Sequence, residues 1–290
     1  MRSFASIRVW VATTLLAGAA LVGRAAEDSA TSTEKKDTLP WEKGAVKLGG
    51  VYAAFDSKVG FGVNNRTGAT LDGEDLLGLD DHLTVFRADA MYRPGKSLRN
   101  QLDFTYASYD RDGSATLSKA INIRGTTYPV GARVDSTLNF DIIRGTYSYA
   151  LLQTERIRVA VGLGIYAIPL EYGLKIQTGG GRSSINGADT VLPVPAVALR
   201  GEFQVLPKLF LNAGIDGMYL DIDDFQGSLL DVNVGVEYRP WKYVGFGVGY
   251  NFLSVQVEGQ DSSSNYPGAD FVGTADVRFS GVLFYGKFSF

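Results

Sequence analysis

The chain has 290 residues, a net charge of −3, 45% hydrophobic residues, 35 Gly, 15 Tyr, 16 Phe and no Cys. So many Gly and aromatic residues, with a mean hydropathy near zero, do not suit a helical membrane protein, which needs unbroken apolar runs of about 20 residues. They favour strands with one wet face and one apolar face. Without Cys, neither a disulfide nor a lipoprotein anchor can form.

The chain begins with the pattern of a secretory signal peptide. Arg2 and Arg8 precede an apolar run from Val9 to Val22, and small residues follow up to Ala26. This run is shorter than the roughly 20 residues of a spanning helix, so we predict a signal peptide over residues 1–25, cleaved after Ala25 or Ala26. Cleavage lowers the net charge to −6, because three Arg and no acid are removed, and an acidic exported protein is a poor candidate for binding nucleic acid.

Residues 26–44 are rich in Ser, Thr, Glu, Lys and Asp, and we expect a flexible periplasmic segment there. From residue 45 to 290 the apolar residues recur with a period of two. Leu230–Arg239 shows the pattern clearly, with Leu, Val and Tyr alternating with Asp, Asn, Gly, Glu and Arg. One face of such a strand belongs in lipid and the other in a polar interior.

The alternating segments predict an all-β fold: a transmembrane antiparallel up-and-down β-barrel of about ten strands, with eight or twelve still possible because Gly and Ala blur the first strand. The predicted strands cover residues 45–56, 82–93, 98–109, 137–151, 156–176, 191–205, 208–221, 228–239, 242–257 and 270–290.

Turns of two lengths alternate between these strands. Short turns with Pro, Gly and charges lie near residues 93–96, 153–155, 206–208 and 239–242, and longer loops lie near 57–81, 110–136, 177–190, 222–228 and 258–269. This alternation is typical of outer-membrane barrels, which have short periplasmic turns and long extracellular loops.

Aromatic residues flank the apolar bands, as in the girdles of membrane barrels. We expect one girdle near the periplasmic turns and one towards the loops. The first contains Tyr92, Tyr238, Trp241 and Tyr243; the second contains Tyr106, Tyr109, Tyr219 and Tyr250.

The last strand ends at a terminal Phe and carries apolar residues at alternate positions. We expect Phe284, Phe288 and Phe290 to point outward, with Tyr285 and Lys287 in the lumen. The pattern resembles the C-terminal signal of outer-membrane barrel precursors, which implies periplasmic chaperones and the barrel-assembly machinery as partners and the cell outer membrane as the location.

Several segments also resemble an uncharacterised family of Gram-negative outer-membrane β-barrel proteins. The resemblance covers most of the mature chain and implies this fold, but it attaches no activity to any residue. The segments are Glu74–Asp80, Tyr128–Gly131, Gly227–Asp231, Glu237–Pro240 and Gly245–Asn251.

If the apolar side of each strand faces lipid, charges of both signs face the lumen. A ten-stranded barrel is only slightly wider than an eight-stranded one, which side chains fill. We therefore expect a charged, largely filled lumen and a structural or surface-exposed role; the alternative is a narrow channel for ions or small solutes. The predicted inward residues are Arg87, Asp89, Arg93, Arg99, Gln101, Asp103, Arg144, Arg158, Arg200, Glu202, Asp216, Asp231, Glu237 and Arg239.

A rim hydrolase acting on lipid or peptide is a second alternative. Its general base would be His82, the one His of the chain, placed at the extracellular start of the second strand. Asp80, Asp81, Asp223 or Asp224 could orient the imidazole. No Ser nearby lies in a nucleophile motif, so we expect no enzyme activity.

We predict no cofactor and no metal. With one His and no Cys, we expect no transition-metal site, and the acidic stretches Asp72–Asp75 and Asp221–Asp224 lack the spacing of a calcium loop. Gly245–Gly249 lies within a strand and is no nucleotide loop. The remaining expected partners are membrane lipid and lipopolysaccharide, whose divalent ions the acidic loops could share, and the chain is expected to be a monomer.

Overall fold

A computed structural model describes residues 39–61, 70–123, 126–179, 181–186, 190–222, 225–259 and 273–290. The predicted signal peptide, Asp223 and Asp224 lie outside these residues. Within the described ranges, no helix is long and apolar enough to cross a membrane.

Ten strands close into an antiparallel barrel in the order β10-β11-β12-β13-β14-β1-β3-β4-β7-β8, and β8 pairs back onto β10. This confirms the predicted fold class and strand number. The ten strands are β1 (Gly44–Phe61), β3 (His82–Tyr92), β4 (Asn100–Thr116), β7 (Arg133–Gln153), β8 (Ile157–Thr178), β10 (Thr190–Leu206), β11 (Leu209–Ile222), β12 (Phe225–Tyr238), β13 (Val244–Gly259) and β14 (Gly273–Ser289).

The first and last strands form the seam that closes the barrel. They pair antiparallel from Ala45 opposite Ser289 to Phe61 opposite Gly273. Beyond the last pair, Gly44 and Phe290 exchange two backbone hydrogen bonds of 3.0 and 2.9 Å. The chain therefore begins and ends its barrel at the same end, as an even strand number requires.

The outer surface is apolar, as the two-residue period predicts. At the end of the chain, Phe284 and Phe288 on β14 and Phe290 just after it are more than half exposed, whereas Lys287 is 2% exposed. Similar alternation on the other strands surrounds the barrel with exposed Leu, Val, Ile and Phe side chains. An apolar outer belt on a closed antiparallel sheet is the form in which strands cross a bilayer.

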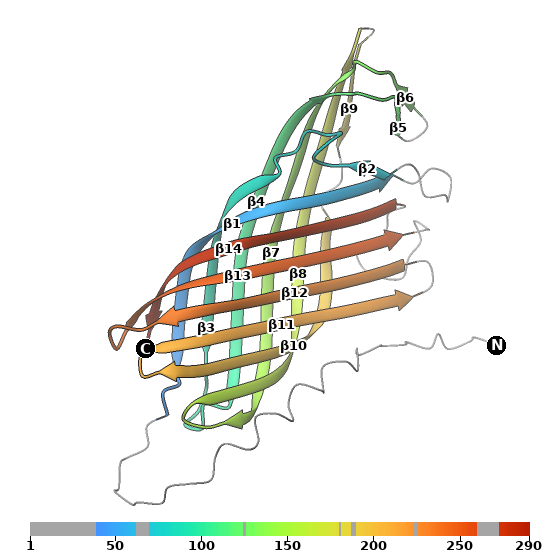
Figure 1. The fold of residues 1–290 in the computed structure, drawn as a ribbon. Coiled ribbons are helices and arrows are strands. Elements are labelled where there is room, and N and C mark those ends of the chain that lie inside the picture. The colour runs from blue at the N-terminus through green and yellow to red at the C-terminus, as the bar shows by residue number, and fades with distance from the viewer. Residues whose placement is uncertain are drawn as a thin grey trace, which may run out of the picture.

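Several strands run further than predicted, because pairing continues into segments expected to be loops. β4 pairs with β7 as far as Thr116 opposite Arg133, so β4, β7 and β8 rise well beyond the other strands at the extracellular end (Figure 1). Four short strands lie at this end: β2 (Thr70–Asp72) on β1, β9 (Gly181–Asn186) on β8, and the hairpin of β5 (Ile121–Ile123) and β6 (Thr126–Tyr128).

The lumen is not polar throughout, which corrects the expectation of a uniformly polar interior. Charged side chains fill its periplasmic half, whereas apolar ones fill the half towards the loops. Tyr109, expected in the outer girdle, is 1% exposed and belongs to this apolar half. Ala107, two residues earlier, points inward, so the two-residue period that places Tyr106 on the outer face places Tyr109 in the lumen. The apolar half contains Val51, Ala53, Phe55, Val85, Ala107, Tyr109, Phe140, Ile142, Tyr166, Ile168, Val194, Ala196, Leu229, Leu253 and Phe279.

The segment after β2 folds inward and packs against β4. Leu79 forms a β-bridge with Gly113. Gly78 has a φ of +66°, a backbone conformation that residues other than glycine rarely adopt. A Cβ atom on Gly113 would lie 2.0 Å from the carbonyl oxygen of Gly78. Only a glycine at position 113 lets these two backbones approach so closely.

Replacing Gly113 with Ala should therefore displace residues 73–81 and destabilise the barrel by about 1–3 kcal/mol, the usual cost of forcing extra atoms into a packed site. Unfolding in urea and limited proteolysis of the 73–81 segment would measure this. Gly145→Ala is a matched control, because a Cβ atom there meets nothing within 4 Å. Equal behaviour of the two variants would contradict the packing described here.

Candidate functional site in the barrel lumen

An aromatic layer crosses the lumen on the extracellular side of the charges. Phe55, Tyr109, Phe140 and Phe279 project inward from β1, β4, β7 and β14. Tyr109 stacks on Phe140 with ring centroids 4.6 Å apart, and it lies 4.9 Å from Phe279 and 6.0 Å from Phe55. None of the four rings is more than 8% exposed. They pack at the spacing of an ordinary aromatic core.

A buried ion pair covers this aromatic layer. Arg111, which is fully buried, places its guanidinium 4.3 Å above the ring of Phe55 and forms a 2.5 Å ion pair with Glu74. Ser57 donates to the same carboxylate through its hydroxyl at 2.7 Å and its backbone N–H at 2.9 Å. Arg111 also donates to the carbonyl of Asp80 at 2.8 Å. The segment between β2 and β3 is thereby fixed inside the mouth of the barrel.

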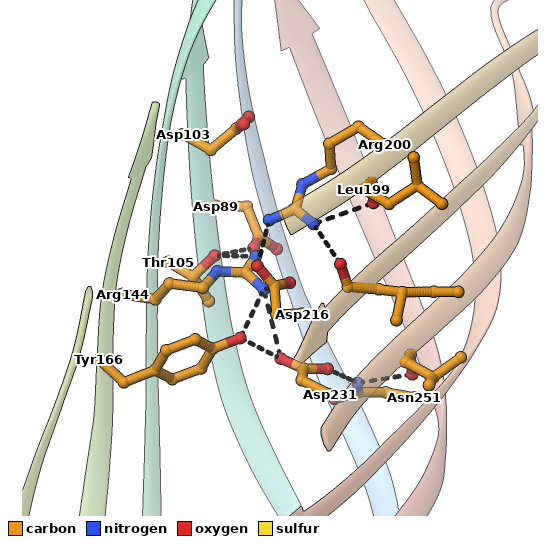
Figure 2. Close-up of polar contacts among 12 residues, drawn as sticks. Asp89, Asp103, Thr105, Arg144, Tyr166, Leu199, Arg200, Asp216, Asp231 and Asn251 are labelled. Carbon is orange, nitrogen blue, oxygen red and sulfur yellow. Dashed lines mark hydrogen bonds and ion pairs between the residues drawn. The ribbon is translucent and has the colours of Figure 1, made fainter. Parts of the chain in front are cut away.

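On the periplasmic side of the aromatic layer lies a central charge layer (Figure 2). Arg144 reaches from β7 to β11 and β12, where it pairs with Asp216 at 3.0 Å and Asp231 at 3.2 Å. Arg200 donates to the other oxygen of Asp216 at 2.8 Å, and Tyr166 donates to Asp231 at 3.0 Å. The charged members of this layer are Arg87, Asp89, Asp103, Arg144, Arg200, Asp216 and Asp231.

Neutral donors and acceptors complete the central layer. Thr105 donates to Asp89 at 2.7 Å and accepts from Arg144 at 2.8 Å. Asn251 accepts from Arg87 at 3.0 Å and donates to Asp231 at 2.9 Å. Buried charges need such partners, because leaving one unpaired is costly. The network joins strands from opposite sides of the barrel.

A periplasmic charge layer lies nearer the short turns. Glu237, which is fully buried, pairs with Lys287 at 2.7 Å, Arg239 at 2.5 Å and Lys47 at 3.4 Å. Glu202 pairs with Arg158 at 3.2 Å and also with Arg93. The charged members of this layer are Glu42, Lys47, Arg93, Arg158, Glu202, Glu237, Arg239 and Lys287.

The residues just before β1 pack against the periplasmic mouth, although the sequence predicts a flexible segment up to residue 44. Trp41 is 4% exposed, contacts Phe210 edge-on at 6.5 Å, and donates to the carbonyl of Thr154 at 2.9 Å. Glu42 pairs with Arg239 at 3.4 Å and also with Lys287. Residues 39–43 therefore belong to the packed periplasmic end of the barrel.

Twelve of the thirteen charged residues predicted to face the lumen contact other luminal polar groups. Arg99 differs: it lies at the periplasmic end, donates to the carbonyl of Ala150 at 3.0 Å, and has no carboxylate partner among the described residues. The sequence reasoning missed Lys47, Glu42, Tyr166 and Tyr109. The two-residue period would have indicated inward positions for Lys47, Tyr109 and Tyr166. Their partners, and the position of Glu42 before β1, depend on how distant strands are staggered.

His82 lies at the extracellular start of β3, where the sequence places it. Its Nδ1 lies 3.0 Å from Asp81, and its ring stacks on Tyr52 at 5.7 Å. The side chains of His82, Asp81 and Tyr52 are all exposed. Asp80 instead supplies a carbonyl to Arg111. Among the described residues, no three His, Cys, Asp or Glu side chains are grouped as metal ligands.

No protein-family model matches the sequence, and no curated protein matches it. Among solved structures, the chain is similar to the outer-membrane protease OmpT of Escherichia coli, with a TM-score of 0.56 and 10% identity over 89% of this chain and 100% of that chain. Ail of Yersinia pestis (TM-score 0.33, 10% identity, 86% and 99% covered) and OprG of Pseudomonas aeruginosa (0.34, 11%, 87% and 99%) are more distant. The chain thus has the fold of an outer-membrane β-barrel, and similarity at this level shows the fold alone.

Replacing Asp216 with Asn should cost about 3–5 kcal/mol of unfolding free energy, because Arg144 and Arg200 would lose a fully buried counter-charge. Urea unfolding of the refolded barrel in detergent would measure it. Asp56→Asn is the control: its pair with Lys58 is 3.9 Å long and exposed, so its loss should change stability by no more than about 1 kcal/mol. A similar small change in both variants would contradict the network.

Replacing His82 with Ala should raise the pKa of the Asp81 carboxyl, which the hydrogen bond from His82 and then the charge of His82 hold below its usual value. A depressed carboxyl pKa stabilises the folded state above the ordinary Asp pKa, and this contribution is lost as the pH falls through the folded value. Carboxyl-carbon NMR titration of both proteins would follow the shift. An unchanged Asp81 titration would show that the pair does not form.

Proposed function

We propose that the protein is an integral outer-membrane barrel that is closed to solutes and acts through its extracellular surface or as a structural component of the membrane. The single observation that carries this proposal is the layered filling of the lumen. The aromatic layer and the central charge layer each reach across the barrel interior, the first through ring contacts and the second through ion pairs and hydrogen bonds.

The aromatic layer supports closure directly. Its four rings come from β1, β4, β7 and β14 and lie in van der Waals contact, with Arg111 packed on Phe55. A hydrated ion would have to separate these rings and also break the salt bridges of Arg144. Each step removes several favourable contacts and offers no polar replacement in the apolar half of the lumen.

The extracellular end supports a surface role, because it has a hydrophobic core of its own. Side chains from the segments after β2 and β4 pack with the extended parts of β7 and β8. A packed core fixes the shape of this surface, as a recognition surface needs. The cluster contains Leu76, Leu77, Leu79, Leu117, Ile121, Tyr128, Ala132, Val134, Leu138, Leu174 and Ile176.

Two alternatives have some support. A chamber of about 140 Å³ in the periplasmic half of the lumen, with charged side chains in its wall, would belong to the path of a narrow channel. A rim hydrolase would use the outward-facing pair of His82 and Asp81 as its general base. Among the described residues, however, the imidazole contacts Asp81 and Tyr52 and no Ser that could act as a nucleophile. Lipid or peptide hydrolysis that is lost in His82→Ala would favour the enzyme over our proposal.

Single-channel recording of the refolded protein in planar bilayers tests closure. We expect no discrete conductance steps, with a general porin as the positive control and a heat-modifiability gel to confirm that the barrel has formed. A narrow channel would instead give steps whose size changes when Arg87, Arg144 or Arg200 is neutralised. Such steps, altered in Arg144→Gln, would overturn the closed-barrel proposal.

A further inference from the structure

The chamber of about 140 Å³ lies between the central and the periplasmic charge layers. Its wall includes six cationic side chains and three carboxylates. An engineered protein cavity of similar size, about 150 Å³, holds benzene, so the chamber can hold a small molecule or ion. The charged residues that line it are Lys47, Arg87, Arg93, Arg144, Arg200, Lys287, Asp89, Asp103 and Glu202.

The carboxylates of the chamber wall already have partners. Asp89 accepts two hydrogen bonds from Arg87 at 3.0 Å and one from Thr105. Glu202 accepts from Arg93 and Arg158. Asp103 accepts from the amide of Gln101 at 2.8 and 2.9 Å. The negative side of the wall is therefore occupied.

The cationic side chains, by contrast, outnumber the carboxylates that pair with them. Among the described residues, the periplasmic charge layer has five cations, Lys47, Arg93, Arg158, Arg239 and Lys287, but only three carboxylates, which each serve two or three of them. The central layer, with three Arg and four Asp, offsets only one of the two extra positive charges.

Some of the described hydrogen-bond donors at the chamber wall are also left without a partner. Lys47 has three N–H donors, and among the described residues Glu237, at 3.4 Å, is the one carboxylate with which it forms an ion pair. The Nε of Arg144, a side chain only 6% exposed, has no hydrogen-bond partner among the described residues. A buried donor without a partner is costly, and so is an uncompensated buried charge. An anion in the chamber would satisfy both.

We propose that this chamber is a binding site for a small inorganic oxyanion of the size of phosphate. Access is from the periplasmic side, where Lys47 keeps 28% of its side chain exposed and Glu42 and Glu202 keep 12–13%. The site is a dead end, because the central charge layer and the aromatic layer lie beyond it. This inference goes beyond the closed-barrel proposal and does not depend on whether current flows.

Isothermal titration calorimetry of the refolded mature barrel in zwitterionic detergent tests the site. Sodium phosphate is titrated while sodium gluconate, whose anion is too large for the chamber, keeps the ionic strength constant. We expect saturable binding of one phosphate per chain. The urea midpoint of unfolding should rise with phosphate, because a ligand of the folded state stabilises it.

Two luminal variants and one matched control locate the binding. Lys47→Gln removes a cation from the wall, and Asn212→Asp adds a carboxylate of nearly the same volume at another lining position. Each should weaken phosphate binding at least tenfold, and Asn212→Asp should also make the urea midpoint insensitive to phosphate. Lys58→Gln, an exposed lysine on the outward face of the same strand, should bind phosphate like the wild type.

Three outcomes would overturn the proposal. Absence of saturable heat in the wild type would mean that the chamber holds water only. Equal weakening by Lys58→Gln and Lys47→Gln would mean that phosphate senses the general charge of the protein. Full binding by both luminal variants, each shown to be folded by heat modifiability, would place the site elsewhere. None of these results bears on conductance, so the two proposals fail independently.

Discussion

Closure of the sheet is the constraint on which the rest of this structure depends. Inside hydrocarbon a backbone N–H or C=O group finds no water, so each strand must be paired on both sides. The pairing of β1 with β14 over the full length of both strands removes the last free edge. With only ten strands, closure leaves a narrow interior. Every second side chain must then be accommodated in that interior, whatever its chemistry.

The interior solves this packing problem by separating its side chains into layers. Carboxylates and guanidinium groups pair across the periplasmic half, and aromatic and aliphatic side chains pack in the other half. Charges placed among the rings would lack partners, and rings placed among the charges would leave gaps in the network. Arg111 shows what an exception requires. It lies beyond the apolar half with Glu74, Ser57 and a carbonyl oxygen as partners, and with the Phe55 ring beneath it.

The sequence predicts the faces of this barrel better than its interior. The two-residue period is a local property, so it determines that Phe284 points outward and Lys287 inward without knowledge of any neighbour. Which luminal residues meet depends on the stagger between strands, and the pairing of Arg144 with Asp231 joins positions 87 residues apart. The inward fold of residues 73–81 was not predictable for a related reason: Gly78 and Gly113 are ordinary loop and strand glycines until their backbones are placed in contact.

The charge imbalance gives a physical reason for the order of residues 39–43. Without Glu42, the five cations of the periplasmic charge layer would share two carboxylates, Glu202 and Glu237. Glu42 supplies the third and bonds to Lys287 and Arg239 as well as to the hydroxyl of Ser289. Trp41 contacts the Phe210 ring edge-on, and the Arg239 guanidinium lies 3.6 Å from the centroid of the same ring. The excess of cations therefore holds residues 39–43 at the periplasmic mouth, and on the luminal side the same excess favours an anion in the chamber.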